Sequence, residues 1–304
     1  MGVALDRRLP AVAIASLAAN VGIVLTGGAV RLTGSGLGCP SWPRCTERSY
    51  VAHGELGLHG VIEFGNRLLT VVVAVVAVVT LVVVWRARPV DRLARRLALV
   101  LAVGVPAQAV LGGITVLTDL NPWVVAGHLL FSLALVAVSV ALLHHFRTRR
   151  DDAVTAAVAR PLRSLVLGTY AAAWVVVGLG TVVTGSGPHA GDVDAPRTGL
   201  DPESVSQLHA DFVFLLVGLT VGTLLAVRAA GASYAIRRAA LVLLVVELAQ
   251  GAVGLVQYAT DLPIALVELH LLGACATVAA ATWLLLRARQ GNVITNERYR
   301  QHPL

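Results

Sequence analysis

The sequence predicts an all-α integral membrane protein with eight transmembrane helices, and its composition is the first reason. Of its 304 residues 57% are hydrophobic and only 13% are charged, whereas a globular domain has about 25% charged residues. Eight apolar runs approach or exceed the roughly 20 residues that a spanning helix needs. The net charge of +7 lies in short arginine clusters between these runs, which argues against nucleic-acid binding. Membrane lipid is therefore the expected surrounding of this chain, and an ordinary soluble enzyme is excluded.

The eight predicted helices follow one another with short connections. The first apolar run lacks a convincing small-residue cleavage site, so we expect it to remain as a helix. The predicted spans are residues 10–31, 59–85, 97–117, 123–146, 163–184, 206–228, 238–259 and 264–287.

The connecting loops alternate in charge, which predicts the orientation. Arginines precede the first span, join spans 2 and 3, 4 and 5, and 6 and 7, and follow the last span. The other loops are acidic or mixed, with Asp119, Asp192, Asp194 and Asp261 among their residues. Basic loops stay in the cytoplasm, so we expect a multi-pass protein of the cell membrane with both termini cytoplasmic.

The chain contains an internal repeat, with halves at residues 1–150 and 151–304. The first and fifth spans both end in Thr-Gly-Ser-Gly, at residues 33–36 and 184–187. The last two spans of each half align without a gap: Gln108 with Gln250, Gly112 with Gly254, Thr118-Asp119 with Thr260-Asp261, and His128 with His270. This pattern predicts two four-helix bundles related by a pseudo-twofold axis along the membrane normal, and such bundles place cofactors between facing helices.

Four histidines lie in the first turns of the even-numbered spans: His59, His128, His209 and His270. These spans enter the membrane from the outer side, so the histidines should lie toward the outer leaflet. They could be interfacial or inter-helix hydrogen-bonding residues. However, ionisable residues inside membranes are rare and usually functional, and two histidines on facing helices can supply both axial ligands of a haem iron. Their repetition in both halves favours haem ligation.

The two halves differ near the first of these histidines. With His59 aligned to His209, one face of the second span has Glu63, Asn66 and Arg67, where the sixth span has Val213, Leu216 and Val217. Glu63 and Arg67 could form a structural ion pair. Alternatively, Glu63 acts on a bound substrate as an acid, a base or a cation stabiliser. The apolar second half suits a stable electron-transferring haem.

Two of the three cysteines lie in the first outer loop, at Cys39 and Cys45. Disulfides persist outside the cytoplasm, and the spacing is compatible with a disulfide that closes a tight loop. Such a pair could be a structural staple or could pass reducing equivalents near the first-half site. Cys275 is expected to be a small buried hydrophobe.

Several stretches strongly resemble the haem A synthase family. They are residues 27–45 (GGAVRLTGSGLGCPSWPRC), residues 62–69 (IEFGNRLL), residues 112–118 (GGITVLT) and His128. The resemblance covers nearly the whole chain. It implies an eight-helix membrane oxidoreductase that converts the C8 methyl group of haem O to the formyl group of haem A for terminal oxidases.

The resemblance also implies roles for individual residues. His209 and His270 would bind a haem b cofactor, and haem O would bind near His59, Glu63 and His128. Cys39 and Cys45 would be the paired cysteines of many bacterial members. Many members have a histidine three residues after the glutamate, where this chain has Asn66. We therefore predict His59 as the first-half ligand on the second span, and Arg31 or Arg67 as partners of haem propionates.

Other functions fit parts of the pattern. A di-haem b membrane cytochrome between quinone and another carrier explains four histidines, but not a glutamate in one half only. A transporter with parallel repeats predicts midplane polar sites, whereas these histidines lie near one face. For a synthase, the chain needs an electron acceptor, which the sequence does not identify, and pathway logic suggests a complex with haem O synthase.

Overall fold

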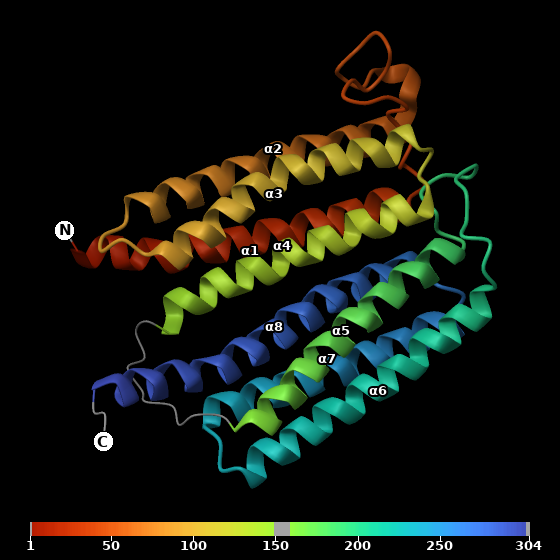
Figure 1. Ribbon diagram of the computed structural model, residues 1–304. Helices are drawn as coiled ribbons and strands as arrows, with labels where there is room; N and C mark the ends of the chain where they lie inside the picture. The colour runs from red at the N-terminus through yellow and green to blue at the C-terminus, as the bar shows by residue number, and fades with distance from the viewer. Residues whose placement is uncertain (1, 149–158, 302–304) are drawn as a thin grey trace.

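The protein is an all-helical chain in the computed structural model, which describes residues 2–148 and 159–301 (Figure 1). Within these ranges there are eight α-helices, one 3-10 helix and no strands. The bounds are α1 Gly2–Leu32, η1 Gly54–Leu56, α2 Gly57–Arg86, α3 Arg92–Leu117, α4 Pro122–Thr148, α5 Arg160–Ser186, α6 Pro202–Ala229, α7 Tyr234–Ala259 and α8 Ile264–Gln301. All eight α-helices are long and apolar enough to cross a membrane, so the predicted all-helical membrane fold is confirmed.

Aspartate side chains cap the N-termini of two helices. Asp91 accepts a hydrogen bond from Ala94 N at 2.9 Å, and Asp201 accepts one from Ser204 N at 2.9 Å, as N-caps do. The Ser204 hydroxyl also donates to Asp201 at 2.7 Å. These bonds, led by the side-chain one, hold the pKa of the Asp201 carboxyl below its ordinary value.

The turns after α3 and α7 have the same conformation, as the Thr-Asp repeat predicts. Asp119 and Leu120 have φ angles of 51° and 59°, and Asp261 and Leu262 both have 58°. This left-handed region is uncommon for residues other than glycine. Its occurrence at aligned positions indicates that the repeat is a repeat of backbone structure as well as of sequence.

The helices of each half contact one another in a closed ring. α1 packs on α2 and α4, and α3 packs on α2 and α4; α5 packs on α6 and α8, and α7 packs on α6 and α8. Contacts between the halves join α4 to α5 and α8, and α1 to α8, in the middle of the molecule (Figure 1). The pseudo-twofold relation stays a prediction, and the boundary between residues 150 and 151 lies outside the described residues.

Buried polar side chains tie helices together within each half. Ser16 Oγ lies 2.8 Å from Thr80 Oγ1 between α1 and α2, and Thr169 Oγ1 lies 3.0 Å from Thr223 Oγ1 between α5 and α6. Lipid tails cannot replace such bonds, so they hold helices in a defined register.

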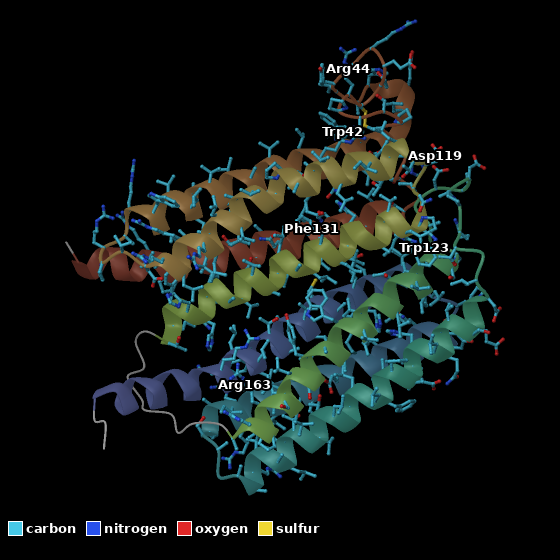
Figure 2. All side chains as sticks on the ribbon, viewed as in Figure 1. Trp42, Arg44, Asp119, Trp123, Phe131 and Arg163 are labelled. Atoms are coloured by element: carbon cyan, nitrogen blue, oxygen red, sulfur yellow. A yellow bond between two sulfur atoms is a disulfide. The ribbon has the colours of Figure 1, made fainter. Side chains whose placement is uncertain are left out.

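The loop between α1 and η1 covers one end of the first half, opposite the end where α1 begins (Figure 2). The predicted disulfide between Cys39 and Cys45 is present, and both cysteines are buried. Trp42 packs against Gly113 on α3, where any side chain would collide with its ring. This loop is therefore a packed cap over α2 and α3.

Candidate functional site

His209 on α6 and His270 on α8 form one pair of half-buried imidazoles in the second half. Each ring packs against a glycine of a neighbouring helix. A Cβ at Gly180 of α5 would lie 3.3 Å from His209 Cε1, and one at Gly254 of α7 would lie 3.2 Å from His270 Cε1. Because glycine has no side chain, each of these positions leaves space for a neighbouring imidazole ring.

The nitrogen atoms of this pair suit a metal-bearing ligand. Nδ1 of both rings is buried and has no hydrogen-bond partner among the described residues. An unpaired buried polar atom is costly, so its presence on both rings is consistent with a group that is added between the helices. Two imidazoles on facing helices are a known axial set for haem, and the donor set of the second half therefore fits haem.

His128 on α4 has the same surroundings in the first half. A Cβ at Gly112 of α3 would lie 3.1 Å from His128 Cε1, and Nδ1 of His128 is also buried without a partner in the described chain. Gln108 donates to the backbone oxygen of His128 at 2.8 Å, as Gln250 does to that of His270. His128 and His270 are therefore structural counterparts, as the alignment predicts.

His59 lies in a different environment. It is exposed, and its Nδ1 lies 2.9 Å from the Oγ of Ser35, a buried residue just beyond the end of α1. Asn66 lies deeper along α2, where its Oδ1 accepts a hydrogen bond of 2.7 Å from Thr26 Oγ1 of α1. The role of His59 as a haem ligand stays a prediction.

The helix bounds correct the alignment of α2 with α6. Asn66 precedes Arg86, the last residue of α2, by 20 residues, and His209 precedes Ala229, the last residue of α6, also by 20. His59 precedes Arg86 by 27 residues. The predicted alignment of the second span with the sixth is therefore wrong by seven residues. This applies to the match of His59 with His209 and to the match of Glu63, Asn66 and Arg67 with Val213, Leu216 and Val217. Seven residues are about two helical turns, so residues seven apart lie on the same helix face. Helical periodicity alone therefore does not reveal a shift of this size.

Glu63 and Arg67 form a polar cluster with several hydrogen bonds in the first half. Glu63 is 5% exposed. Its Oε2 accepts from the backbone N–H of Cys39 at 2.5 Å, and its Oε1 accepts from Arg67 Nη2 at 2.5 Å and Nε at 3.1 Å. Arg67 also donates to the backbone oxygens of Cys39, Ser41 and Arg44 at 2.9–3.0 Å. The ion pair is therefore present, and it joins α2 to the disulfide loop.

This arrangement has a chemical consequence. An ionised carboxylate that is bound by a guanidinium can only accept hydrogen bonds, and it supplies a fixed negative charge in a water-poor site. The sequence predicts the pairing of Glu63 with Arg67, but not the bond from Cys39, because that bond depends on the loop conformation. The catalytic role of Glu63 stays a prediction.

Arg31 lies where the loops that follow α1 and α5 meet. Its Nε donates to the backbone oxygen of His189 at 2.7 Å, and its Nη2 donates to that of Thr184 at 2.9 Å. Nearby, Gly36 N donates to Gly191 O at 2.8 Å. Arg31 thus links α1 to the end of α5 and its loop, a role that the sequence does not indicate. Its predicted pairing with a haem propionate is not tested by these contacts.

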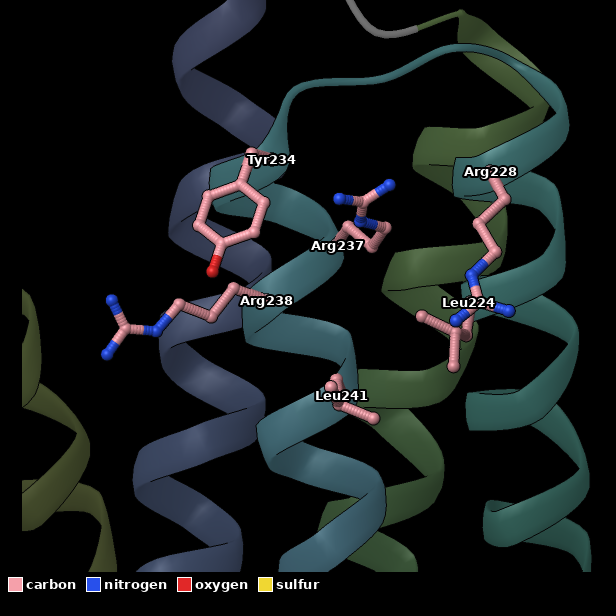
Figure 3. A pocket seen from close by; sticks show the side chains of 6 residues that line it. All are labelled: Leu224, Arg228, Tyr234, Arg237, Arg238 and Leu241. Carbon is pink, nitrogen blue, oxygen red and sulfur yellow. The ribbon is translucent and has the colours of Figure 1, made fainter.

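A pocket at the opposite end of the second half is not part of this site. It lies between the end of α6 and the start of α7 (Figure 3) and is lined by Leu224, Arg228, Tyr234, Arg237, Arg238 and Leu241. The guanidinium groups of Arg228 and Arg238 extend to opposite sides of α7. They do not converge on one point, so the pocket is not built around a single anion.

Residues 11–191 of the chain match the model of the COX15-CtaA family, described as cytochrome oxidase assembly protein. The match covers more than half of the chain, including the disulfide loop, α2 with Glu63 and α4 with His128. The chain belongs to this family.

Individual relatives of this COX15-CtaA member are named heme A synthase. One from Geobacillus thermodenitrificans is 34% identical over 138 residues, covering 44% of this chain and 42% of the relative. One from Symbiobacterium thermophilum is 32% identical over 184 residues, covering 58% and 59%. One from Bacillus pumilus is 35% identical over 124 residues, covering 40% and 39%. The chain thus spans about two fifths to three fifths of the length of these relatives.

Proposed function

We propose that this chain is a haem A synthase, a membrane oxidoreductase that converts the C8 methyl group of haem O to a formyl group. The observation that carries the proposal is an asymmetry between similar halves. Both halves have a histidine packed on a glycine, at His128 and His270, but only the first half adds a buried glutamate near the outer end of its second helix. A cofactor site and a substrate site on one scaffold explain this difference. The relatives are named heme A synthase, which supports haem A as the product.

In the proposal, the second half holds haem b through His209 and His270. When bound, haem b accepts and donates single electrons. Leu216 belongs to the buried core of this half, and Phe212 packs on that core. These apolar side chains keep water away from the space between the helices. No ionised side chain needs to act here, which suits a cofactor that only transfers electrons.

The first half is the proposed substrate site, with His59, His128, Asn66 and Arg67 around haem O and Glu63 as the catalytic residue. Two successive two-electron oxidations turn the methyl group into a hydroxymethyl group and then a hydrated aldehyde. Each adds the oxygen of one water molecule, releases two protons and passes two electrons to an external electron acceptor. Loss of one water molecule from the hydrated aldehyde gives the formyl group. The fixed negative charge of Glu63 would stabilise positive charge that develops on the methyl carbon. The bonds from Arg67 and Cys39 favour this role over proton abstraction.

The proposal includes a place in the cell. The arginine-rich loops assign both termini to the cytoplasm, so both haem sites lie toward the outer leaflet of the cell membrane. Haem O reaches the site from the membrane, and a complex with haem O synthase would deliver it directly.

Replacing Glu63 tests the reaction. We expect Glu63→Gln to abolish haem A formation in membranes that contain haem O, while haem b is still bound. Glu247→Gln is the matched control, because Glu247 is equally buried (3% exposed) but lies on α7 of the second half, where it accepts a 2.8 Å bond from Thr220. Haem A formation at the wild-type level in Glu63→Gln would refute the catalytic role.

Replacing the histidines tests the division between the halves. His209→Ala should remove haem b from the purified protein, and His128→Ala should remove the substrate haem instead. Extraction and chromatography of the pigments identify each haem. Two molecules of haem b per chain, with no haem O or haem A, would indicate the di-haem cytochrome rather than a synthase.

A further inference from the structure

The further inference concerns the axial ligands of the substrate haem, and it rests on the proposed function. At three of the four positions in the two sites a histidine ring packs on a glycine. His128 and His270 have the same glycine and glutamine neighbours, and His209 packs on Gly180. The fourth position is the place on α2 that corresponds to His209, and the residue there decides how the iron is bound.

The bonds within each half locate that position. Thr33 Oγ1 donates to Ala29 O at 2.8 Å, and Thr184 Oγ1 donates to Gly180 O at 2.9 Å. This shared bond makes Ala29 the counterpart of Gly180, against which the His209 ring packs. On α2, the residue beside this stretch of α1 is Asn66, bonded to Thr26 at 2.7 Å, whereas His59 is bonded to Ser35, beyond the helix end.

The distance along the helix gives the same answer independently. Asn66 and His209 each lie 20 residues before the end of their helix, or about 30 Å at 1.5 Å per residue. His59 lies about 10 Å further out along α2. If His59 were the ligand, its imidazole would have to leave Ser35 and reach inward across two helical turns.

The two halves differ at both of these neighbouring positions. The second half has a large imidazole against Gly180. The first half has the smaller carboxamide of Asn66 on α2, and Ala29 at the place on α1 that matches Gly180. A Cβ at Gly180 would lie 3.3 Å from His209 Cε1, so the methyl group of Ala29 would crowd an imidazole at position 66. Hence α1 and α2 are adapted to a side chain that does not bind iron there.

We propose that the substrate haem has a single histidine ligand, His128, and that Asn66 lies on its other axial side, which stays open to a small exogenous ligand. An iron with one imidazole is five-coordinate and high-spin, whereas an iron with two imidazoles is six-coordinate and low-spin. The two haems of one chain therefore differ in spin state, and only the substrate haem binds carbon monoxide in the ferrous form.

The test uses the full chain purified with haem b and haem O, studied by electron paramagnetic resonance and by carbon monoxide titration. The wild type should show one high-spin and one low-spin haem and bind about one carbon monoxide per chain. His59→Ala should leave the spin state of each bound haem unchanged, because His59 is proposed to lie beside haem O without binding its iron. Asn66→His combined with Ala29→Gly should convert the high-spin signal to low-spin and lower carbon monoxide binding at least about tenfold.

The controls distinguish failure of the single-ligand proposal from misfolding and from failure of the proposed function. The low-spin signal of the second half reports folding in every variant, and Ala29→Gly alone shows the effect of the space without a new ligand. Two low-spin haems in the wild type, one of which becomes high-spin in His59→Ala, would overturn the proposal and make His59 the ligand. Absence of haem O from the first half, with haem b still in the second, would overturn the proposed function itself.

Discussion

Arg67 is the residue through which the first half holds its disulfide loop. Its guanidinium donates to the carboxylate of Glu63 and to three backbone oxygens between Cys39 and Arg44. Arginine has five donors in a planar fork and always keeps its charge, so a lysine could satisfy only some of these acceptors. The carboxylate and the disulfide loop are therefore positioned by one side chain.

Removal of Arg67 should destabilise the protein. Arg67→Gln leaves the buried Glu63 carboxylate without its counter-charge, which costs about 3 kcal/mol when a buried pair is broken. We expect Arg67→Gln to unfold in detergent at a clearly lower temperature than the wild type. The unfolding temperature of Arg67→Lys should lie between those of the wild type and Arg67→Gln. Arg44→Gln is the control, because Arg44 is an exposed loop residue that bonds Glu47 O and stacks on Tyr50. An unchanged unfolding temperature for Arg67→Gln would show that the cluster does not stabilise the loop.

At this scale the sequence predicts residue types better than their positions. The ion pair of Glu63 with Arg67 follows from a spacing of four residues, and the Cys39–Cys45 disulfide from two cysteines in a short loop. The correspondence of His59 with His209 fails, because residues seven apart share a helix face. Only the helix ends and the bonds to α1 separate His59 from Asn66.

Helix pairs form the next scale, and in three of them a glycine lies against a histidine ring. The pairs are α3 with α4 at Gly112, α5 with α6 at Gly180, and α7 with α8 at Gly254. Small residues let membrane helices approach closely, and here they also leave space for an imidazole. The alignment of Gly112 with Gly254 is visible in the sequence, but its contact with the ring is not, since a sequence pattern does not give the lateral neighbour.

Filling this space should weaken haem binding in the second half. Gly180→Ala places a methyl group 3.3 Å from His209 Cε1, and such overpacking typically costs about 1–3 kcal/mol. We expect less haem b per chain and an altered absorption spectrum. Gly178→Ala on the same helix is the control, since nothing lies within 4 Å of its Cβ position and alanine is favoured in a helix by roughly 0.5–1 kcal/mol. Equal haem content in both variants would contradict a role of Gly180 in seating the ligand.

The whole molecule is two rings of helices joined along α1, α4, α5 and α8. The number and order of the helices follow from hydropathy alone, because each span must be long and apolar. The contacts between the halves do not, since lipid and apolar helix faces are chemically similar and small differences in packing decide which helices meet. The bonds from Arg31 to the backbone of His189 and Thr184 are one such contact.

The orientation of the whole molecule is the last prediction. The loop after α2 is flanked by Arg86, Arg88 and Arg92, whereas the loop after α5 contains Asp192 and Asp194, so the first should be cytoplasmic and the second external. Single cysteines can report this cleanly, because Cys39 and Cys45 are joined and Cys275 is buried.

A membrane-impermeant maleimide applied to intact cells should label Val193→Cys, in the loop after α5, and not Val90→Cys, in the loop after α2. The wild-type side chains are 93% and 52% exposed, so both sites are accessible to a reagent on their own side. After permeabilisation of the membrane, both variants should react. Labelling of Val90→Cys alone in intact cells would invert the orientation and would place the histidines, Glu63 and the disulfide loop toward the cytoplasm, where a lasting disulfide is not expected.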